Sequence, residues 1–113
     1  MGTRIYTLMG AVDETLTTAV EPSFIAHQCV ASYYPDDTFT AGTEVVPTGG
    51  AIEIKGRAVG ASAFDVFAGS PLIADNVNAM ATARGIVNAY EAVPTSIEGA
   101  THYKVTFVAS ETN

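Results

Sequence analysis

Strict alternation of apolar and charged side chains over residues 51–57 limits what this chain can fold into more than any other feature. Ile52 and Ile54 alternate there with Glu53 and Lys55. Successive side chains of an extended chain point to opposite faces of a sheet, so one face of this segment is buried and the other solvated. The pattern predicts a β-strand.

A partner strand is predicted directly after it. Gly60 provides a corner, and residues 61–67 again have the composition of a strand. In this interpretation the two segments form a hairpin, with Phe64, Val66 and Ala68 on one face of the second strand.

Short strand-like segments recur along the rest of the chain about every ten residues, with turn signals between them. Further strands are predicted over residues 3–9, 16–20, 24–34, 72–73, 86–93 and 102–108. Pro94 is expected to end the strand before it, because proline cannot donate a hydrogen bond to a sheet ladder. In the last strand, Tyr103, Val105 and Phe107 are expected to face the core. A long loop or short edge strands are predicted over residues 38–50.

Residues 76–84 are compatible with two structures. Asp75 could cap a short alanine-rich helix that Gly85 ends. The competing interpretation is a strand, which is favoured because the alternation continues into residues 86–93.

Together these segments predict an all-β protein of roughly seven to nine strands, a small antiparallel β-sandwich or a partly open barrel, with a short helix at 76–84 as the open alternative. The 113 residues fit a single domain. Residues 1–20 have a low density of core-forming side chains and are expected to be an N-terminal arm or an edge strand.

The charge of the chain disfavours two classes of partner. Twelve acidic and five basic residues give a formal net charge of −7, and the basic residues are scattered along the sequence. Binding to nucleic acid or to an anionic membrane needs several cations on one face. We therefore expect no nucleic-acid partner and no membrane association.

Catalytic and metal-binding chemistry is also disfavoured. Cys29 is the single cysteine and lies two residues from His27, so the two side chains would share one face of a strand. His102 could add a third metal ligand, but no clustered carboxylate completes a set. A buried thiol beside a structural imidazole is the favoured interpretation, and neither an enzyme nor a cofactor is predicted.

The first residues do not have the pattern of a leader. The segment MGTRIYTLMGAVDETL carries an apolar stretch that Thr7, Gly10 and Asp13 interrupt. Neither a signal peptide nor a spanning helix is predicted, and the chain is expected to be made in the cytoplasm.

Three aromatic residues next to a predicted turn are candidate contact residues. Tyr33, Tyr34 and Phe39 flank Pro35 and could form a platform that contacts a partner or binds carbohydrate. Alternatively, they seal the edge of the core, which is the favoured reading of the two.

Half of the chain resembles small virion proteins of tailed phages. The resemblance rests on GGAIEIKGRAVGASAFDVFAGSPL (residues 49–72) and VPTSIEGATHYKVTF (residues 93–107), in which a strand hairpin is followed by an apolar strand, a turn and a last strand. The resemblance implies a compact β-sandwich without disulfides that acts as a capsid cement or decoration subunit, or in the tail and its adaptors. It implies no catalytic residues.

We therefore predict a structural protein located in the virion. The favoured role is that of a capsid cement or decoration subunit. Such a subunit contacts the major capsid protein or another virion protein and assembles as a symmetric homo-oligomer. A tail or head-to-tail connector component is the nearest alternative. A carbohydrate-binding β-sandwich module is the alternative from a different class.

Overall fold

The computed structural model describes residues 2–111 and confirms the predicted all-β sandwich. Within these residues it contains nine β-strands and no helix. The strands are β1 (Thr3–Ala11), β2 (Leu16–Ala19), β3 (Ala26–Tyr34), β4 (Gly49–Ala58), β5 (Asp65–Val66), β6 (Leu72–Ile73), β7 (Ala81–Arg84), β8 (Val87–Glu98) and β9 (His102–Ser110).

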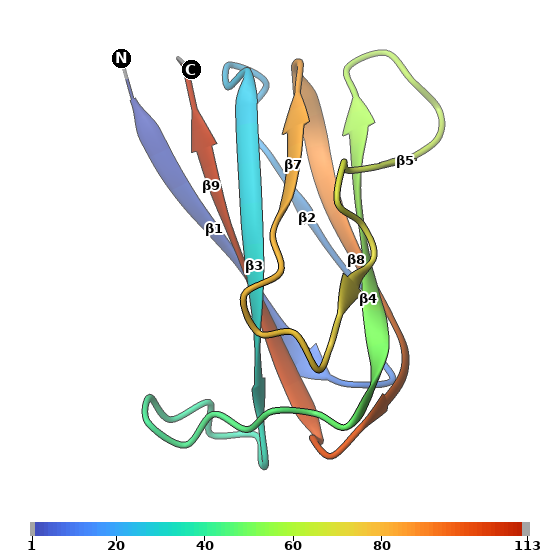
Figure 1. Ribbon diagram of the computed structural model, residues 1–113. Helices are drawn as coiled ribbons and strands as arrows, with labels where there is room; N and C mark the ends of the chain where they lie inside the picture. The colour runs from blue at the N-terminus through green and yellow to red at the C-terminus, as the bar shows by residue number, and fades with distance from the viewer. Residues whose placement is uncertain (1, 112–113) are drawn as a thin grey trace.

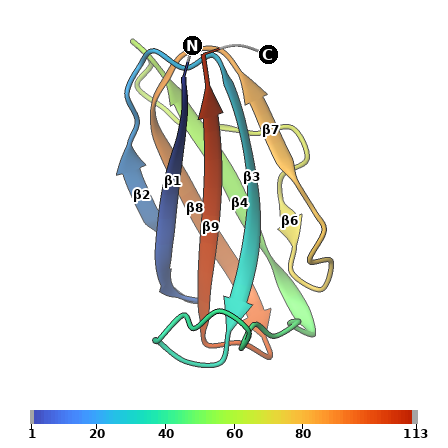
Figure 2. The ribbon, with the colours of Figure 1, turned by 90° about the vertical axis from the view of Figure 1, so that its left-hand side faces the viewer.

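The strands form two antiparallel sheets that pack face to face (Figure 1). Sheet A has the order β1-β9-β3-β7, and sheet B has the order β2-β8-β4-β5, with β6 also paired to β4. Figure 2 shows sheet A from its outer side, with both chain ends at the same end of the sandwich. β1 and β2, the strands of the predicted arm, are edge strands of sheets A and B, on the same side of the molecule.

The core lies between the sheets and follows from the alternation of the long strands. Ile52 and Ile54 of β4 are fully buried, as the charge alternation predicts, and so are Tyr103, Val105 and Phe107 of β9. Because side chains of both sheets interdigitate in one layer, each long strand needs one apolar face only.

The predicted hairpin partner is correct in position but wrong in its faces. Phe67 is buried at 3% exposure, whereas Val66 is 56% exposed and Ala68 is also exposed. β5 has only two residues, and the Phe67 N–H donates to the carbonyl of Ile54 at 2.9 Å, which turns the Phe67 ring inward. The ring reaches Tyr90 and Phe107 at centroid distances of 5.9 and 6.1 Å.

Residues 76–84 contain no helix. Residues 77–78 form a turn, residues 79–80 have no regular structure, and the favoured strand exists only as β7, which begins at Ala81. Pairing of β7 with β3 buries Ala81 completely, a gain of tertiary burial that outweighs the helix propensity of alanine.

The prediction that Pro94 ends a strand is wrong, because β8 continues to Glu98. The Val20 N–H donates to the Asn88 carbonyl, so even-numbered β8 residues direct their backbone groups toward β2. β2 begins at Leu16, which pairs with Ala92, and no strand formed by residues 2–111 lies beside Pro94 on that side. A proline is tolerated there because its missing N–H would face an open edge.

Candidate functional site

The predicted aromatic contact residues do not form an exposed platform. Tyr33 and Tyr34 are only 2% and 1% exposed, and burial raises the pKa of the Tyr33 hydroxyl to about 12. Phe39 alone is partly exposed. The structure therefore places Tyr33 and Tyr34 in the sealed edge of the core, the second of the two readings of this cluster.

Tyr34 is buried even though it points to the outer side of sheet A. The loop after β3 folds back and brings the Phe39 ring to 5.3 Å from the Tyr34 ring and 5.6 Å from the His102 ring. The ammonium of Lys104 lies 5.6 Å from the centroid of the same Tyr34 ring. This cluster covers Tyr34, so that of the three candidate aromatic residues only Phe39 keeps a partly exposed ring.

His27 is a buried structural residue. Its Nδ1 lies in hydrogen-bond contact with the Tyr90 hydroxyl, and its Nε2 lies 2.8 Å from the Gly85 carbonyl. Since a carbonyl only accepts, Nε2 carries the proton and Nδ1 accepts from Tyr90. Burial lowers the pKa of His27, which keeps the ring neutral in this arrangement.

Cys29 and His102 do not join His27 in a reactive or metal-binding site. The Cys29 thiol is buried, and burial raises its pKa to about 12, so almost no thiolate forms at neutral pH. His102 pairs with Tyr34, seven positions along the β3–β9 ladder from His27, or roughly 23 Å. No group of three metal-ligating side chains occurs in residues 2–111.

The outer face of sheet A is the surface with the most distinctive composition. β1, β3, β7 and β9 contain none of the twelve acidic residues, and their charged side chains are Arg4, Arg84 and Lys104. We call sheet A face the outward-pointing side chains Thr3, Ile5, Thr7, Met9, Gln28, Val30, Ser32, Thr82, Arg84, Lys104, Thr106, Val108 and Ser110. It lies toward the viewer in Figure 2.

Apolar side chains are exposed on and beside this face. Ile5 is 64% exposed, Met9 47% and Val30 42%, and Met80, which precedes β7, is 51% exposed. Threonines lie between them on neighbouring strands, since Thr7 pairs with Thr106 and Thr106 pairs with Val30. Such a nearly uncharged surface would cost little to desolvate if another protein covered it.

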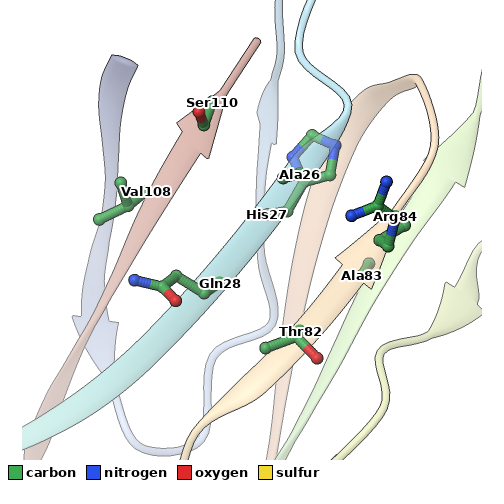
Figure 3. A pocket seen from close by; sticks show the side chains of 8 residues that line it. All are labelled: Ala26, His27, Gln28, Thr82, Ala83, Arg84, Val108 and Ser110. Atoms are coloured by element: carbon green, nitrogen blue, oxygen red, sulfur yellow. The ribbon is translucent and has the colours of Figure 1, made fainter. Parts of the chain in front are cut away.

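A groove of about 390 Å³ indents the sheet A face near the chain ends (Figure 3). Gln28 of β3 lies between Thr82 of β7 and Val108 of β9, and Arg84 lies further along β7. The lining combines one amide, hydroxyls, a guanidinium and apolar side chains, and the His27 side chain beneath it is fully engaged. This set can accept a protein side chain, but it lacks a nucleophile with a base beside it.

The outer face of sheet B has the ordinary composition of a solvated surface. Glu53, Lys55 and Arg57 of β4 lie beside Glu91 of β8, and Lys55 pairs with Glu53 at 3.1 Å. Arg57 Nε donates to the Asn88 side chain at 3.0 Å. The two faces therefore differ in charge, since the strands of sheet A carry no acidic side chain whereas this face of sheet B carries both signs.

Sequence reasoning missed the sheet A face, although a signal for it was present. Six of the nine strands, among them all four of sheet A, lack Asp and Glu, in a chain with twelve acidic residues. The signal becomes meaningful only when the strand order is known, because β1, β9, β3 and β7 are far apart in sequence.

The described part of the chain contains no helix long and apolar enough to cross a membrane. Comparison with curated proteins finds no match. A solved structure described as "Bacillus endospore appendages form a novel family of disulfide-linked pili" is similar over 98% of this chain and 88% of that one, with 12% sequence identity and a TM-score of 0.45. The family described as "Domain of unknown function (DUF7265)" matches residues 1–112, and the chain therefore belongs to this family.

Proposed function

We propose that this protein is a structural subunit that acts through protein–protein contacts on the virion of a tailed phage, as a capsid cement or decoration protein. The observation that carries the proposal is the sheet A face, which has no acidic side chain on any of its four strands. In a chain of net charge −7, a face free of acidic groups can approach a protein surface without repelling acidic patches on it.

The apolar content of the face supports the same role. Ile5, Met9 and Val30 are exposed at 42–64% on the outer side of sheet A, where no third sheet packs within residues 2–111. Cement proteins need many shallow contacts more than one deep pocket, and a flat face of threonine, valine, isoleucine and methionine provides them. The shell partner in this proposal is the major capsid protein or another virion protein.

The residues that could have supported chemistry have structural roles instead. His27 joins Tyr90 to the Gly85 carbonyl, and Cys29 is buried beside it on the same face of β3. The proposal therefore assigns them to the core and does not include catalysis or a cofactor. Tyr33 and Tyr34 are buried, so only Phe39, which is partly exposed, is left of the three aromatic residues of the carbohydrate-binding alternative.

Quantitative mass spectrometry of purified phage particles tests whether the chain is part of the virion and in how many copies. We expect the copies of this chain, relative to the most abundant shell protein, to be near one or a simple fraction. A ratio of a few per cent would move the chain to the tail or the connector. Absence of the chain from particles would overturn the virion proposal.

A pair of matched variants tests the sheet A face. Val30→Glu places a carboxylate in the centre of the face, whereas Val66→Glu places one at a similarly exposed position of sheet B. When each purified variant is added to particles that lack the chain, we expect binding to fall at least about tenfold for Val30→Glu only. Equal binding of both variants would exclude the sheet A face as the contact.

A further inference from the structure

The outer edge of β1 is the longest unprotected strand edge in residues 2–111. β7 is the edge strand on the opposite side of sheet A and has four residues. Its Thr82 exchanges two backbone hydrogen bonds of 2.9 Å with Ala68. β2 has four residues and β5 two. β1 has nine residues, without proline or a bulge, and β9 pairs with it along its whole length on one side only.

Hydrogen bonds at both ends of the β1–β9 ladder show which backbone groups are open. The Glu111 N–H donates to the Gly2 carbonyl at 3.1 Å, and the Val12 N–H donates to the Thr101 carbonyl at 3.0 Å. In an antiparallel ladder bonded pairs alternate, so even-numbered β1 residues bond to β9 and odd-numbered residues direct N–H and C=O away from it.

Four consecutive odd positions are open. The fifth odd position, Ala11, is not open, because Glu14 engages both of its backbone groups. The Glu14 carboxylate accepts from the Ala11 N–H at 3.0 Å, and the Glu14 N–H donates to the Ala11 carbonyl at 3.0 Å. No backbone hydrogen bond within the described residues engages the outward N–H and C=O groups of Thr3, Ile5, Thr7 and Met9. An edge of this length with open donors and acceptors is a template for another strand.

We propose that a second copy of this chain pairs with this edge, β1 against β1 in antiparallel orientation, about a two-fold axis that passes between the two Tyr6 residues. This register places Thr3 opposite Met9 and Ile5 opposite Thr7 of the other copy. Every open residue then exchanges both of its backbone groups, and Ala11 stays outside the pairing. The four open residues, which occupy every second position from Thr3 to Met9, are thus self-complementary under a two-fold operation.

Charge and layering favour a second copy over an isolated peptide. The only charged side chain on β1 is Arg4, which in this register lies opposite Leu8 of the other copy, so no like charges face each other. β1 and β2 end on the same side of the two layers (Figure 2). A second copy of the two-sheet sandwich could cover the edges of both sheets on that side, whereas a single extended peptide would cover only the edge of sheet A.

The pairing joins the two copies of sheet A into one continuous sheet, and the sheet A face doubles in size. This β1–β1 pairing is the contact that holds together the homo-oligomer of the proposed function. It rests on that function only in so far as the oligomer is located on virions. Self-association of the purified chain is therefore a separate measurement from its presence on particles.

The first experiment measures the mass of the purified full chain in solution by sedimentation, at concentrations up to about 1 mM. We expect a dimer for the natural sequence and for Thr7→Ala. Thr7→Pro removes one outward N–H without touching the ladder to β9, and we expect it to weaken the dimer at least about tenfold. A natural chain that stays monomeric, or a Thr7→Pro dimer of unchanged strength, would overturn the proposal.

A second experiment tests the register and does not depend on how well Thr7→Pro folds. Opposite residues of a bonded antiparallel pair have Cα atoms about 5.5 Å apart, within the range of a disulfide. Ile5→Cys mixed with Thr7→Cys should form a mixed disulfide under mild oxidation, whereas Ile5→Cys mixed with Met9→Cys should form much less. Equal yields in the two mixtures would contradict the β1 register, whatever the particle measurement shows.

Discussion

Tyr90 of β8 and Phe107 of β9 stack face to face between the two sheets, with ring centroids 4.0 Å apart and planes 7° from parallel. Both side chains have no exposed surface. The Phe67 ring packs edge-on against both of them, so the three rings form the centre of the core.

Phe107→Ala tests how much this stack stabilises the fold. Deleting a buried phenylalanine ring removes its burial and leaves a cavity, and we expect the free energy of unfolding to fall by about 3–5 kcal/mol. Urea denaturation of the variant measures it. The control is Thr106→Ala, one residue away on the outer face, for which we expect a change within about 0.5 kcal/mol. Similar losses for the two variants would contradict a core centred on the stack.

The buried His27 makes stability depend on pH. Burial lowers the pKa of the native imidazole below the ordinary value of 6.5, so the unfolded chain binds a proton first as the pH falls. The stability that depends on neutral His27 is complete well above pH 6.5 and is lost progressively as the pH falls from there toward the native pKa. Urea denaturation at a series of pH values between 7.5 and 5 should show this decline.

His27→Gln separates this effect from other titrating groups. We expect a flatter stability profile below pH 6.5, at the cost of about 1–3 kcal/mol at neutral pH, because the hydrogen bonds to Tyr90 and Gly85 are disturbed. His102→Gln, at the partly exposed histidine, is the matched control and should keep the decline of the natural chain. A decline that persists in His27→Gln would assign it to other residues.

Sequence alone predicted the parts of the fold in which one strand alternates strictly over a long run. Ile52 and Ile54 are buried as expected, and so is the inner face of β9, because a period of two leaves no choice of face once one side is apolar. In the segment after Gly60 the assignment of faces failed. The run there is short, and the position of Phe67 depends on its bond to β4 rather than on its own pattern.

The candidate site was harder to predict because its properties are not local. Tyr34 points to the outer side of its sheet, yet the loop that carries Phe39 covers it, and no feature of residues 33–39 alone indicates that cover. The acid-free sheet A face likewise appears only when four separate segments are placed side by side. Local alternation specifies which side chains a strand buries, but not which strands share a surface.

Cys29 is expected to be unreactive in the folded protein. It is 2% exposed, and burial raises the pKa of its thiol to about 12, so both access and thiolate formation are suppressed. Reaction of the thiol with a chromogenic disulfide reagent at about pH 8 should be slow in buffer. It should be fast in roughly 8 M urea, which unfolds the chain and exposes Cys29. The control is Cys29→Ala combined with Val30→Cys, whose thiol on the sheet A face should react at once. Fast labelling of native Cys29 would place it at an accessible site.

Gly50 and Gly42 differ in one respect that a pair of alanine variants can isolate. Both have left-handed backbones, with φ of +96° and +93°. A Cβ at Gly50 would clash with the Ser96 carbonyl oxygen, at the irregular start of the β4–β8 ladder, whereas a Cβ at Gly42 would meet nothing within 4 Å.

Both variants carry the backbone strain of an alanine at positive φ, about 1–2 kcal/mol, but only Gly50→Ala must also displace the backbone of β8. For Gly42→Ala we expect the free energy of unfolding, measured by urea denaturation, to fall by this strain alone. For Gly50→Ala we expect it to fall by a further amount of about 1–3 kcal/mol. Equal losses would mean that the start of the ladder can shift freely. The close approach of β4 and β8 would then not be what requires glycine at position 50.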